Sequence, residues 1–194
     1  VNDPPTAVND SGYSTPFETA ITLSDVLAND SDIDGDVIVI TSVSSSGGQA
    51  QLNADQTITF TPAGGFSGQA TVNYIVSDPD GLTASGIATV NVLLNSAPTA
   101  VDDTGLVMEA GTTIVLDSIL DNDSDADGDA ISLLSATASV GTVSVSSPTS
   151  LSVSIPKDTL VAVVQVTYTI QDTKGQTAEA TVTIEVIPDN FAPI

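Results

Sequence analysis

Apolar and polar residues alternate along much of this chain, with the period of two that is typical of half-buried β-strands. The alternation is clearest in residues 57–60 and 181–186, which are rich in Thr, Val and Ile. No stretch shows the 3.6-residue period of an amphipathic helix. In the first half of the chain, strands are expected near residues 5–9, 19–27, 37–44, 49–53, 57–61, 69–77 and 84–94.

The whole pattern occurs twice. Residues 2–10 match residues 95–103, and the Asp-rich segment 30–36 matches 123–129, both with an offset of 93 residues. Such self-similarity is the signature of tandem repeats. The expected domains are residues 1–94 and 95–189, and residues 190–194 are expected to begin a further repeat or a linker.

Each repeat has the size and strand number of an immunoglobulin-like sandwich. Seven short strands in about 93 residues fit that fold, in which Greek-key connections join two sheets. Tyr74 and Tyr168 fall in the sixth strand of each repeat and are expected to be core or corner residues. The predicted fold class is therefore all-β, with two tandem immunoglobulin-like Greek-key β-sandwich domains.

The charge of the chain is almost entirely negative. It contains 25 Asp and Glu residues but only two basic residues, Lys157 and Lys174, which gives a formal net charge of −23. This charge disfavours binding to nucleic acid and to anionic membrane surfaces. No apolar run approaches the roughly 20 residues needed for membrane insertion. A generally acidic surface, as in proteins adapted to salt water, is one explanation of the charge.

A second explanation is a bound cation, because the Asp residues cluster. Each repeat carries four Asp residues at alternate positions with a Gly before the last. They are Asp30, Asp32, Asp34 and Asp36 in the first repeat, and Asp123, Asp125, Asp127 and Asp129 in the second. Ca²⁺ takes about six to eight oxygen ligands in an irregular cage that suits Mg²⁺ less well. Zinc, copper and iron are disfavoured because His and Cys are absent. The sequence therefore predicts Ca²⁺ as the cofactor of these two loops.

The loops begin like an EF-hand but do not complete one. The twelfth position holds Thr41 or Leu134 in place of the required Glu, and the flanking residues 37–40 are strand-like. An EF-hand is therefore rejected. The predicted ion site remains, because it depends on ligand chemistry and not on that motif.

The Greek-key topology predicts which other residues lie near the loops. The amino terminus, the loop between the second and third strands, and the loop between the sixth and seventh strands share one pole of such a domain. In the first repeat this pole is expected to hold Asn2, residues 30–36, Asp78 and Asp80. In the second repeat it is expected to hold Asn95, residues 123–129 and Asp172. For Asp78 and Asp80 a plain hairpin turn is an equally good explanation.

The pole of the second repeat is expected to face the end of the first repeat that carries Asp10 and Glu18. Ca²⁺ ligands would then come from both repeats, and bound ions would rigidify the joint by neutralising like charges. Asp103, which matches Asp10 in the repeat, is a further candidate ligand.

Several motifs together resemble a known family. They are Asn-x-Ala-Pro at 95–98, the Val-Asn-Asp and Val-Asp-Asp triplets at 8–10 and 101–103, and residues 27–36, 61–68 and 74–78. Their combination is similar to the bacterial cadherin-like tandem repeats of large calcium-dependent surface adhesins. The resemblance implies a cadherin-like sandwich, an extracellular location at the bacterial cell surface, and a role as a Ca²⁺-rigidified spacer in a secreted adhesin or biofilm protein. Because Lys174 replaces Asp80, the second repeat is expected to hold a smaller calcium set.

The expected function is non-enzymatic. Without His or Cys the usual nucleophile–base pairs cannot be assembled, and no aromatic sugar platform accompanies the paired Asp residues that glycoside hydrolysis would use. The expected partners are neighbouring repeats of the same chain. The alternative is a carbohydrate-binding or homophilic adhesion module that binds cell-surface glycans or identical modules.

Overall fold

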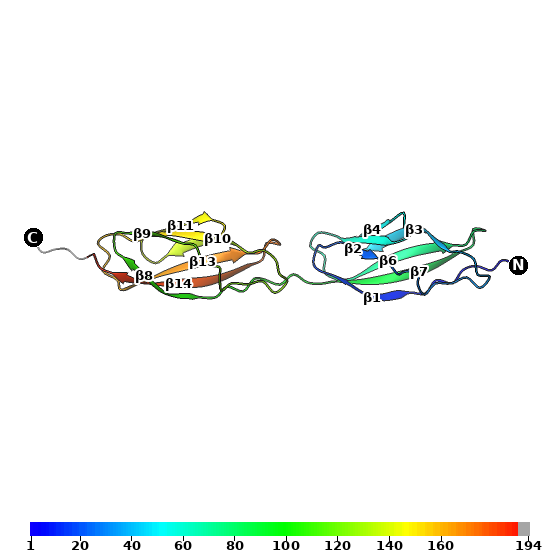
Figure 1. Ribbon diagram of the computed structural model, residues 1–194, viewed down its shortest axis with the longest axis horizontal. Coiled ribbons are helices and arrows are strands. Elements are labelled where there is room, and N and C mark those ends of the chain that lie inside the picture. Colours follow the sequence, from blue (N-terminus) through cyan, green and yellow to red (C-terminus); the bar gives the residue numbers. More distant parts are fainter. Residues whose placement is uncertain (190–194) are drawn as a thin grey trace, which may run out of the picture. The chain divides into compact units, whose positions relative to one another are not determined.

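The computed structural model describes residues 1–189, which form β-strands and connecting loops without a helix. The chain divides into two compact units, the first Val1–Asn95 and the second beginning at Ser96 (Figure 1). The predicted all-β fold with two tandem sandwich domains is confirmed. The continuation expected at residues 190–194 lies outside the described residues. Within residues 1–189 no helix is long and apolar enough to cross a membrane.

Unit 1 contains two sheets. One has the strand order β1-β7-β6-β3 and the other β2-β5-β4. The first strand pairs in parallel with the last, and the other neighbours are antiparallel. The strands are β1 (Asp10–Thr15), β2 (Ile21–Leu23), β3 (Val39–Ser46), β4 (Gly48–Leu52), β5 (Ile58–Pro62), β6 (Gly68–Ser77) and β7 (Thr83–Val92).

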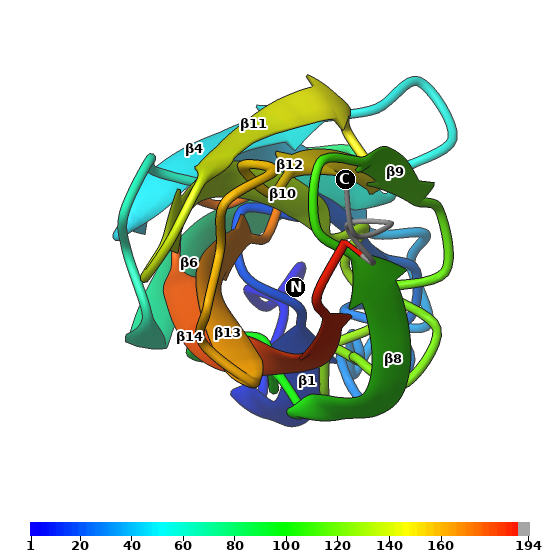
Figure 2. The ribbon, with the colours of Figure 1, turned by 90° about the vertical axis from the view of Figure 1, so that its left-hand side faces the viewer.

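Unit 2 repeats this topology, with sheets ordered β10-β13-β14-β8 and β11-β12-β9. Figure 2 shows β11, β12 and β9 lying across from β13, β14 and β8, so that the two sheets enclose the core. The strands are β8 (Asp103–Glu109), β9 (Thr113–Leu116), β10 (Ser132–Ala138), β11 (Thr142–Ser147), β12 (Ser150–Ser154), β13 (Val163–Gln171) and β14 (Thr177–Ile187).

The alternation read from the sequence corresponds to burial in the long strands. In β6 the alternate residues Ala70, Val72, Tyr74 and Val76 are completely buried, whereas the intervening positions are more exposed. Side chains at positions i and i+2 of a strand face the same side of its sheet, so these residues line one wall of the core. β14 repeats the pattern in unit 2, where Val182 and Ile184 are completely buried.

The expected first strand at residues 5–9 is wrong. This segment makes a single isolated bridge, in which Thr6 pairs with Ser31, and the first strand begins at Asp10, where it pairs with Ala88. The physical reason is a competing partner. The Val8 amide donates to Asp30 Oδ1 at 2.7 Å, so the segment is bound to the Asp-rich loop before it reaches the sheet.

The two predicted core tyrosines lie in β6 and β13, and both are completely buried. Gly86 lies opposite Tyr74 across β6 and β7. A Cβ atom at Gly86 would lie 2.2 Å from Tyr74 Cζ, so the ring passes over a position that has no side chain. The ring is thereby directed toward the segment before β1 and the Asp-rich loop, where its hydroxyl group makes its contacts.

Candidate calcium site

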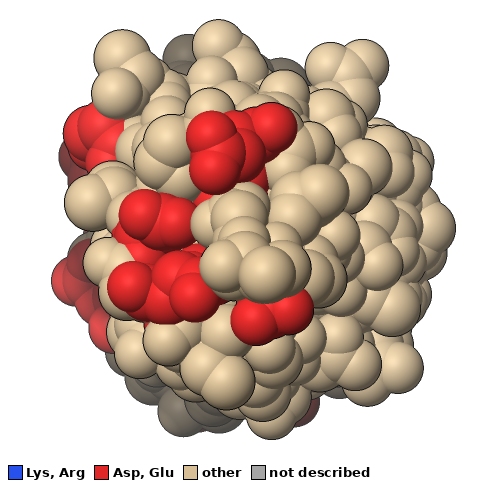
Figure 3. Space-filling view, turned by 90° about the vertical axis from the view of Figure 1, so that its right-hand side faces the viewer, with Lys and Arg blue, Asp and Glu red and all other residues tan. Residues whose placement is uncertain are grey.

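Three segments of unit 1 meet at one pole, as the Greek-key topology predicts. The Asn2 side-chain amide donates to Asp78 Oδ2 at 2.7 Å, and the Asp3 amide donates to Asp34 Oδ2 at 2.7 Å. The amino-terminal segment therefore bonds to both the Asp-rich loop and the β6–β7 turn. Figure 3 looks onto the amino-terminal end of unit 1 and shows carboxylates gathered there, with no described Lys or Arg on that face.

The two Asp-rich loops have the same backbone conformation. In unit 1 the Asp34 amide donates to Asp32 Oδ1 at 2.8 Å, and in unit 2 the Asp127 amide donates to Asp125 Oδ1 at 2.8 Å. The following glycines have φ values of 83° and 80°, in the left-handed region that favours Gly. The loops are thus paired Asx turns that hold several carboxylates close together.

Each loop leaves a buried carboxylate oxygen without a hydrogen-bond donor. Asp30 Oδ1 accepts the Val8 amide, but Asp30 Oδ2 has no hydrogen-bond partner, and neither do Asp32 Oδ2 and Asp125 Oδ2. A buried charged acceptor without a donor is costly, by about 1–3 kcal/mol or more. A hard divalent cation would satisfy such oxygens, so the donor set fits Ca²⁺.

These loops are not complete metal cages by themselves. Within residues 1–189 no group of three or more Asp or Glu side chains is arranged so that it could hold an ion. Ca²⁺ sites also use backbone carbonyl, amide and water oxygens, so carboxylates need supply only part of the coordination shell. The best candidate ligands are Asp30, Asp32 and Asp125, each of which has a buried oxygen without a hydrogen-bond donor.

Crowding of the carboxylates affects their protonation. Loss of hydration raises the pKa of Asp36, and the nearby charges of Asp32, Asp34, Asp78 and Asp80 raise it further. Asp78 behaves differently, because it accepts hydrogen bonds from the Asn2 side chain and the Leu82 amide. Although its desolvation acts in the opposite direction, these bonds hold the pKa of Asp78 below its usual value.

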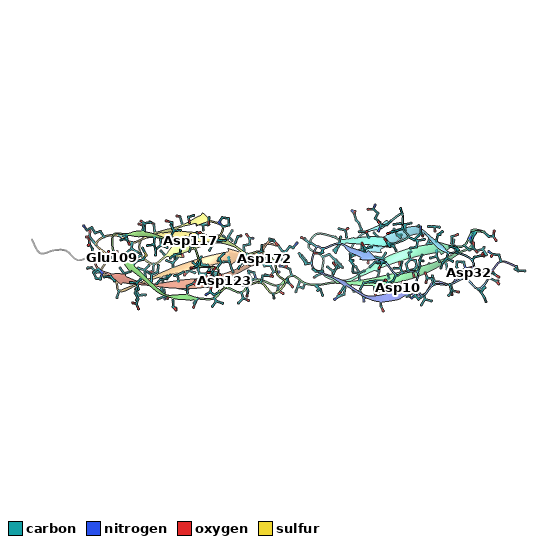
Figure 4. All side chains as sticks on the ribbon, viewed as in Figure 1. Asp10, Asp32, Glu109, Asp117, Asp123 and Asp172 are labelled. Carbon is teal, nitrogen blue, oxygen red and sulfur yellow. The ribbon has the colours of Figure 1, made fainter. Side chains whose placement is uncertain are left out.

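The corresponding pole of unit 2 repeats the contact between the amino-terminal segment and the Asp-rich loop and adds a bond from Thr173. The Ser96 amide donates to Asp127 Oδ2 at 2.6 Å, and the Thr173 hydroxyl donates to Asp129 Oδ1 at 2.9 Å. Asp172 is buried, and its Oδ1 accepts the amides of Lys174 and Gln176 at 2.8 Å each. Figure 4 shows Asp123 and Asp172 toward the same end of unit 2, with Glu109 at the opposite end. Asn95, the last residue of unit 1, is also buried.

Asp78 and Asp172 both stabilise the turn that follows their strand. Asp78 Oδ1 accepts the Leu82 amide at 2.8 Å, four residues on, as Asp172 Oδ1 accepts the amide of Gln176. These bonds are the ones that the plain-turn explanation requires. In Asp78 the second oxygen binds the Asn2 side chain, which joins the turn to the amino-terminal segment.

A second carboxylate cluster lies around the buried tyrosine of each unit. The Tyr74 hydroxyl lies 3.0 Å from Asp10 Oδ2, 3.1 Å from the Val8 carbonyl and 3.4 Å from Asp30 Oδ1. One hydroxyl proton cannot serve three acceptors at once. In unit 2 the Tyr168 hydroxyl lies 3.1 Å from Asp103 Oδ2 and 3.2 Å from Asp123 Oδ2.

The placement of Asp10 with Glu18 in the first interstrand connection is therefore wrong. Asp10 is the first residue of β1, and its carboxylate lies beside Tyr74 and the Asp-rich loop of its own unit. Glu18 lies between β1 and β2, where its Oε1 accepts the Gly65 amide at 2.9 Å. The sequence signal for this cluster is the Val-Asn-Asp triplet at 8–10 together with Tyr74 in β6. Only the pairing of β1 with β7, which lies beside β6, brings them together.

Burial governs protonation in this second cluster. Partial desolvation raises the pKa of Asp10, and the charge of Asp30 adds to the rise, although hydrogen bonds from Tyr74 and Asn29 oppose it. Desolvation likewise raises the pKa of Asp103 and of Asp123 in unit 2.

We expect the calcium-free protein to become more stable as the pH falls from about 7 to about 4. The pKa values of Asp10, Asp36, Asp103 and Asp123 are raised in the folded state. Their stabilising contribution is therefore fully present below the unfolded pKa and is lost as the pH rises through the folded pKa. The lowered pKa of Asp78 acts in the opposite direction at one site. The urea midpoint, measured across this range in calcium-free buffer, should rise on acidification, and a steady fall would contradict the prediction.

Comparison with known proteins identifies the family. The Bacterial Ig domain family matches residues 2–92 and again residues 95–185. No curated protein matches the chain. Among solved structures, the endo-fucoidan hydrolase MfFcnA4_H294Q of glycoside hydrolase family 107 is 18% identical, with a TM-score of 0.40, over 96% of this chain and 29% of that one.

Two cadherins are also similar to the chain. Drosophila N-cadherin EC1-4 is 14% identical over 96% of this chain and 50% of its own, with a TM-score of 0.40. Human mucin-like protocadherin EC1-2 is 14% identical over 95% of this chain and 98% of its own, with a TM-score of 0.38. The chain spans only 26–29% of the first three solved structures that it matches. Because the family match covers both repeats almost end to end, the chain belongs to the Bacterial Ig domain family and carries two tandem copies of that domain.

Proposed function

We propose that this chain is a non-enzymatic, Ca²⁺-binding spacer module of a large bacterial extracellular adhesin or biofilm protein. The observation that carries the proposal is the buried carboxylate oxygen without a donor in the Asp-rich loop of each Ig domain. Bacterial Ig domains commonly occur in surface or extracellular proteins, and their fold is typically non-enzymatic. The two domains have no disulfides, so bound ions would supply stabilisation that cysteine cannot.

In each unit, the Asp-rich loop would hold the ion. Asp30 and Asp32 in unit 1 and Asp125 in unit 2 offer oxygens that no donor occupies, and Asp34, Asp36, Asp127 and Asp129 lie in the same turns. Bound Ca²⁺ supplies the positive charge that the chain lacks. Hydrogen bonds from backbone amides to the Asp side chains fix each loop and orient the carboxylate oxygens.

Calorimetric titration tests the binding step. We expect Ca²⁺ to bind in both units, and Asp32→Asn and Asp125→Asn each to remove the site of one unit. Asp158→Asn is the matched control, since Asp158 is an exposed acid outside both loops. Equal binding of Ca²⁺ by all three variants and by the parent chain would overturn the proposal, as would equally tight binding of Mg²⁺.

The spacer role rests on the sequence. The resemblance to calcium-dependent tandem repeats implies that bound Ca²⁺ stiffens the junction between the repeats. Small-angle X-ray scattering with Ca²⁺ and with a chelator tests this step. A particle whose maximum dimension spreads over a broader range without Ca²⁺ would support the spacer role, and identical scattering in both states would contradict it.

The expected partners are the neighbouring repeats of the same protein. The alternative is binding to cell-surface glycans or to identical modules. Glycan-array binding would favour the carbohydrate-binding alternative. Ca²⁺-dependent dimers in sedimentation would favour homophilic adhesion.

A further inference from the structure

The two units differ at one edge of the sandwich, between the first strand and the turn after the second. In unit 1, Tyr13 of β1 reaches across this edge, and its hydroxyl donates to Asp25 Oδ1. In unit 2 the positions 93 residues later hold Leu106 and Ser118. The strands have the same register in both units, since Tyr13 pairs with Val90 and Leu106 pairs with Ile184. The pair that closes the edge in unit 1 is thus replaced by two shorter side chains.

Unit 2 has a cavity of about 170 Å³ at this edge. Three polar and three apolar residues line it: Asp103, Thr104, Leu106, Leu116, Ser118 and Ile119. Leu116 and Ile119 are buried members of the unit 2 core, so the apolar part of the cavity reaches the interior. An apolar cavity of about 150 Å³ is large enough to hold benzene, so this one has room for a small organic molecule.

The negative charge of Asp103 in the lining favours a positively charged ligand. Asp103 brings a carboxylate to the cavity, and its Oδ2 already accepts the Tyr168 hydroxyl at 3.1 Å. Thr104 and Ser118 also line the cavity, and their hydroxyl groups can accept hydrogen bonds. A cation with N–H donors would match these acceptors, and a short hydrocarbon stem would match Leu106, Leu116 and Ile119. The chain itself supplies few cations, and its Lys157 pairs with Asp189 at 3.3 Å.

We propose that this cavity binds a small primary alkylamine in its ammonium form, with the ammonium group at Asp103 and the alkyl stem between Leu106, Leu116 and Ile119. The site differs from the Ca²⁺ proposal in its ligand, and it shares one residue with the Ca²⁺ candidates, since Asp103 contacts the Tyr168 hydroxyl that also contacts Asp123. In unit 1 the hydrogen-bonded pair Tyr13 and Asp25 occupies the equivalent place.

The test uses n-butylamine as the probe and follows backbone amide shifts of the whole chain by NMR. The buffer contains about 0.15 M salt, which screens the long-range attraction of amines to the acidic surface. We expect saturable shifts of residues in β8, β9 and the turn after β9. Two further probes separate the contributions: n-butanol has the stem without the charge, and tetramethylammonium has the charge without N–H donors. Both are expected to bind at least about tenfold more weakly.

Exchanging the edge pairs between the units gives two matched variants. Leu106→Tyr with Ser118→Asp should fill the cavity and abolish the shifts, although it adds one negative charge. Tyr13→Leu with Asp25→Ser should create a new site in unit 1, although it removes one. Non-specific attraction predicts the opposite order for both variants. Butylamine shifts that persist in the filled variant, or equal shifts with n-butanol, would overturn the proposal.

Discussion

Ca²⁺ is expected to raise the thermal midpoint of the calcium-free protein by about 10–20 °C, whereas Mg²⁺ should have little effect. A ligand present at about 100 times its dissociation constant stabilises the folded state by about 2.7 kcal/mol. For a domain of roughly 95 residues, each kcal/mol shifts the midpoint by about 4–8 °C. The physical source is the set of buried oxygens of Asp30, Asp32 and Asp125, which accept no hydrogen bond and which a bound cation would coordinate. Differential scanning calorimetry with Ca²⁺, with Mg²⁺ and with a chelator measures the shift.

Two loop variants assign the stabilisation to the units. Asp32→Asn should remove the calcium-dependent rise for unit 1, and Asp125→Asn should remove it for unit 2. The exposed Asp158→Asn should keep both, which shows that loss of one negative charge is not the cause. A midpoint that Ca²⁺ and Mg²⁺ raise equally would identify the effect as screening of the net charge of −23, and the loops would then be solvated turns.

Replacing the buried tyrosine is expected to have the second large effect. Tyr74→Ala should destabilise unit 1 by about 3–5 kcal/mol, because it removes a completely buried aromatic ring and leaves a cavity. Tyr74→Phe keeps the ring and should cost less, about 1–3 kcal/mol, since the acceptor that the hydroxyl proton serves, Asp10 or the Val8 carbonyl, then loses its donor. Tyr168→Ala and Tyr168→Phe should repeat the series in unit 2.

Hydrogen exchange of the β6 and β13 amides is the appropriate measurement, because it reports on each unit separately. Tyr74 variants should lower protection in β6 and leave β13 unchanged. Equal losses for the Ala and Phe variants would mean that the hydroxyl contacts dominate, and an unchanged Phe variant would mean that the hydroxyl contributes nothing net.

Much of the fold could be predicted from local pattern. A period of two marks the buried positions of β6 and β14 directly, because a strand with one buried face must alternate. The repeat also transfers each assignment from one unit to the other. The first strand could not be predicted in this way, since residues 5–9 are extended in either case. They pair with the Asp-rich loop and not with the sheet, through the bridge between Thr6 and Ser31, and this long-range contact leaves no mark in the local pattern.

The sequence alone determined the repeated strand pattern, the two Asp-rich loops and the excess of carboxylates over cations, because each is a property of neighbouring residues or of composition. Only the tertiary structure placed Asp10 beside Tyr74, 64 residues away, and left the oxygens of Asp30, Asp32 and Asp125 without donors. It alone also showed that Leu106 and Ser118 leave open the edge that Tyr13 and Asp25 close. Contacts of this kind depend on which strands pair and on how far each side chain reaches across the sandwich, and neither is encoded in the periodicity of a single segment.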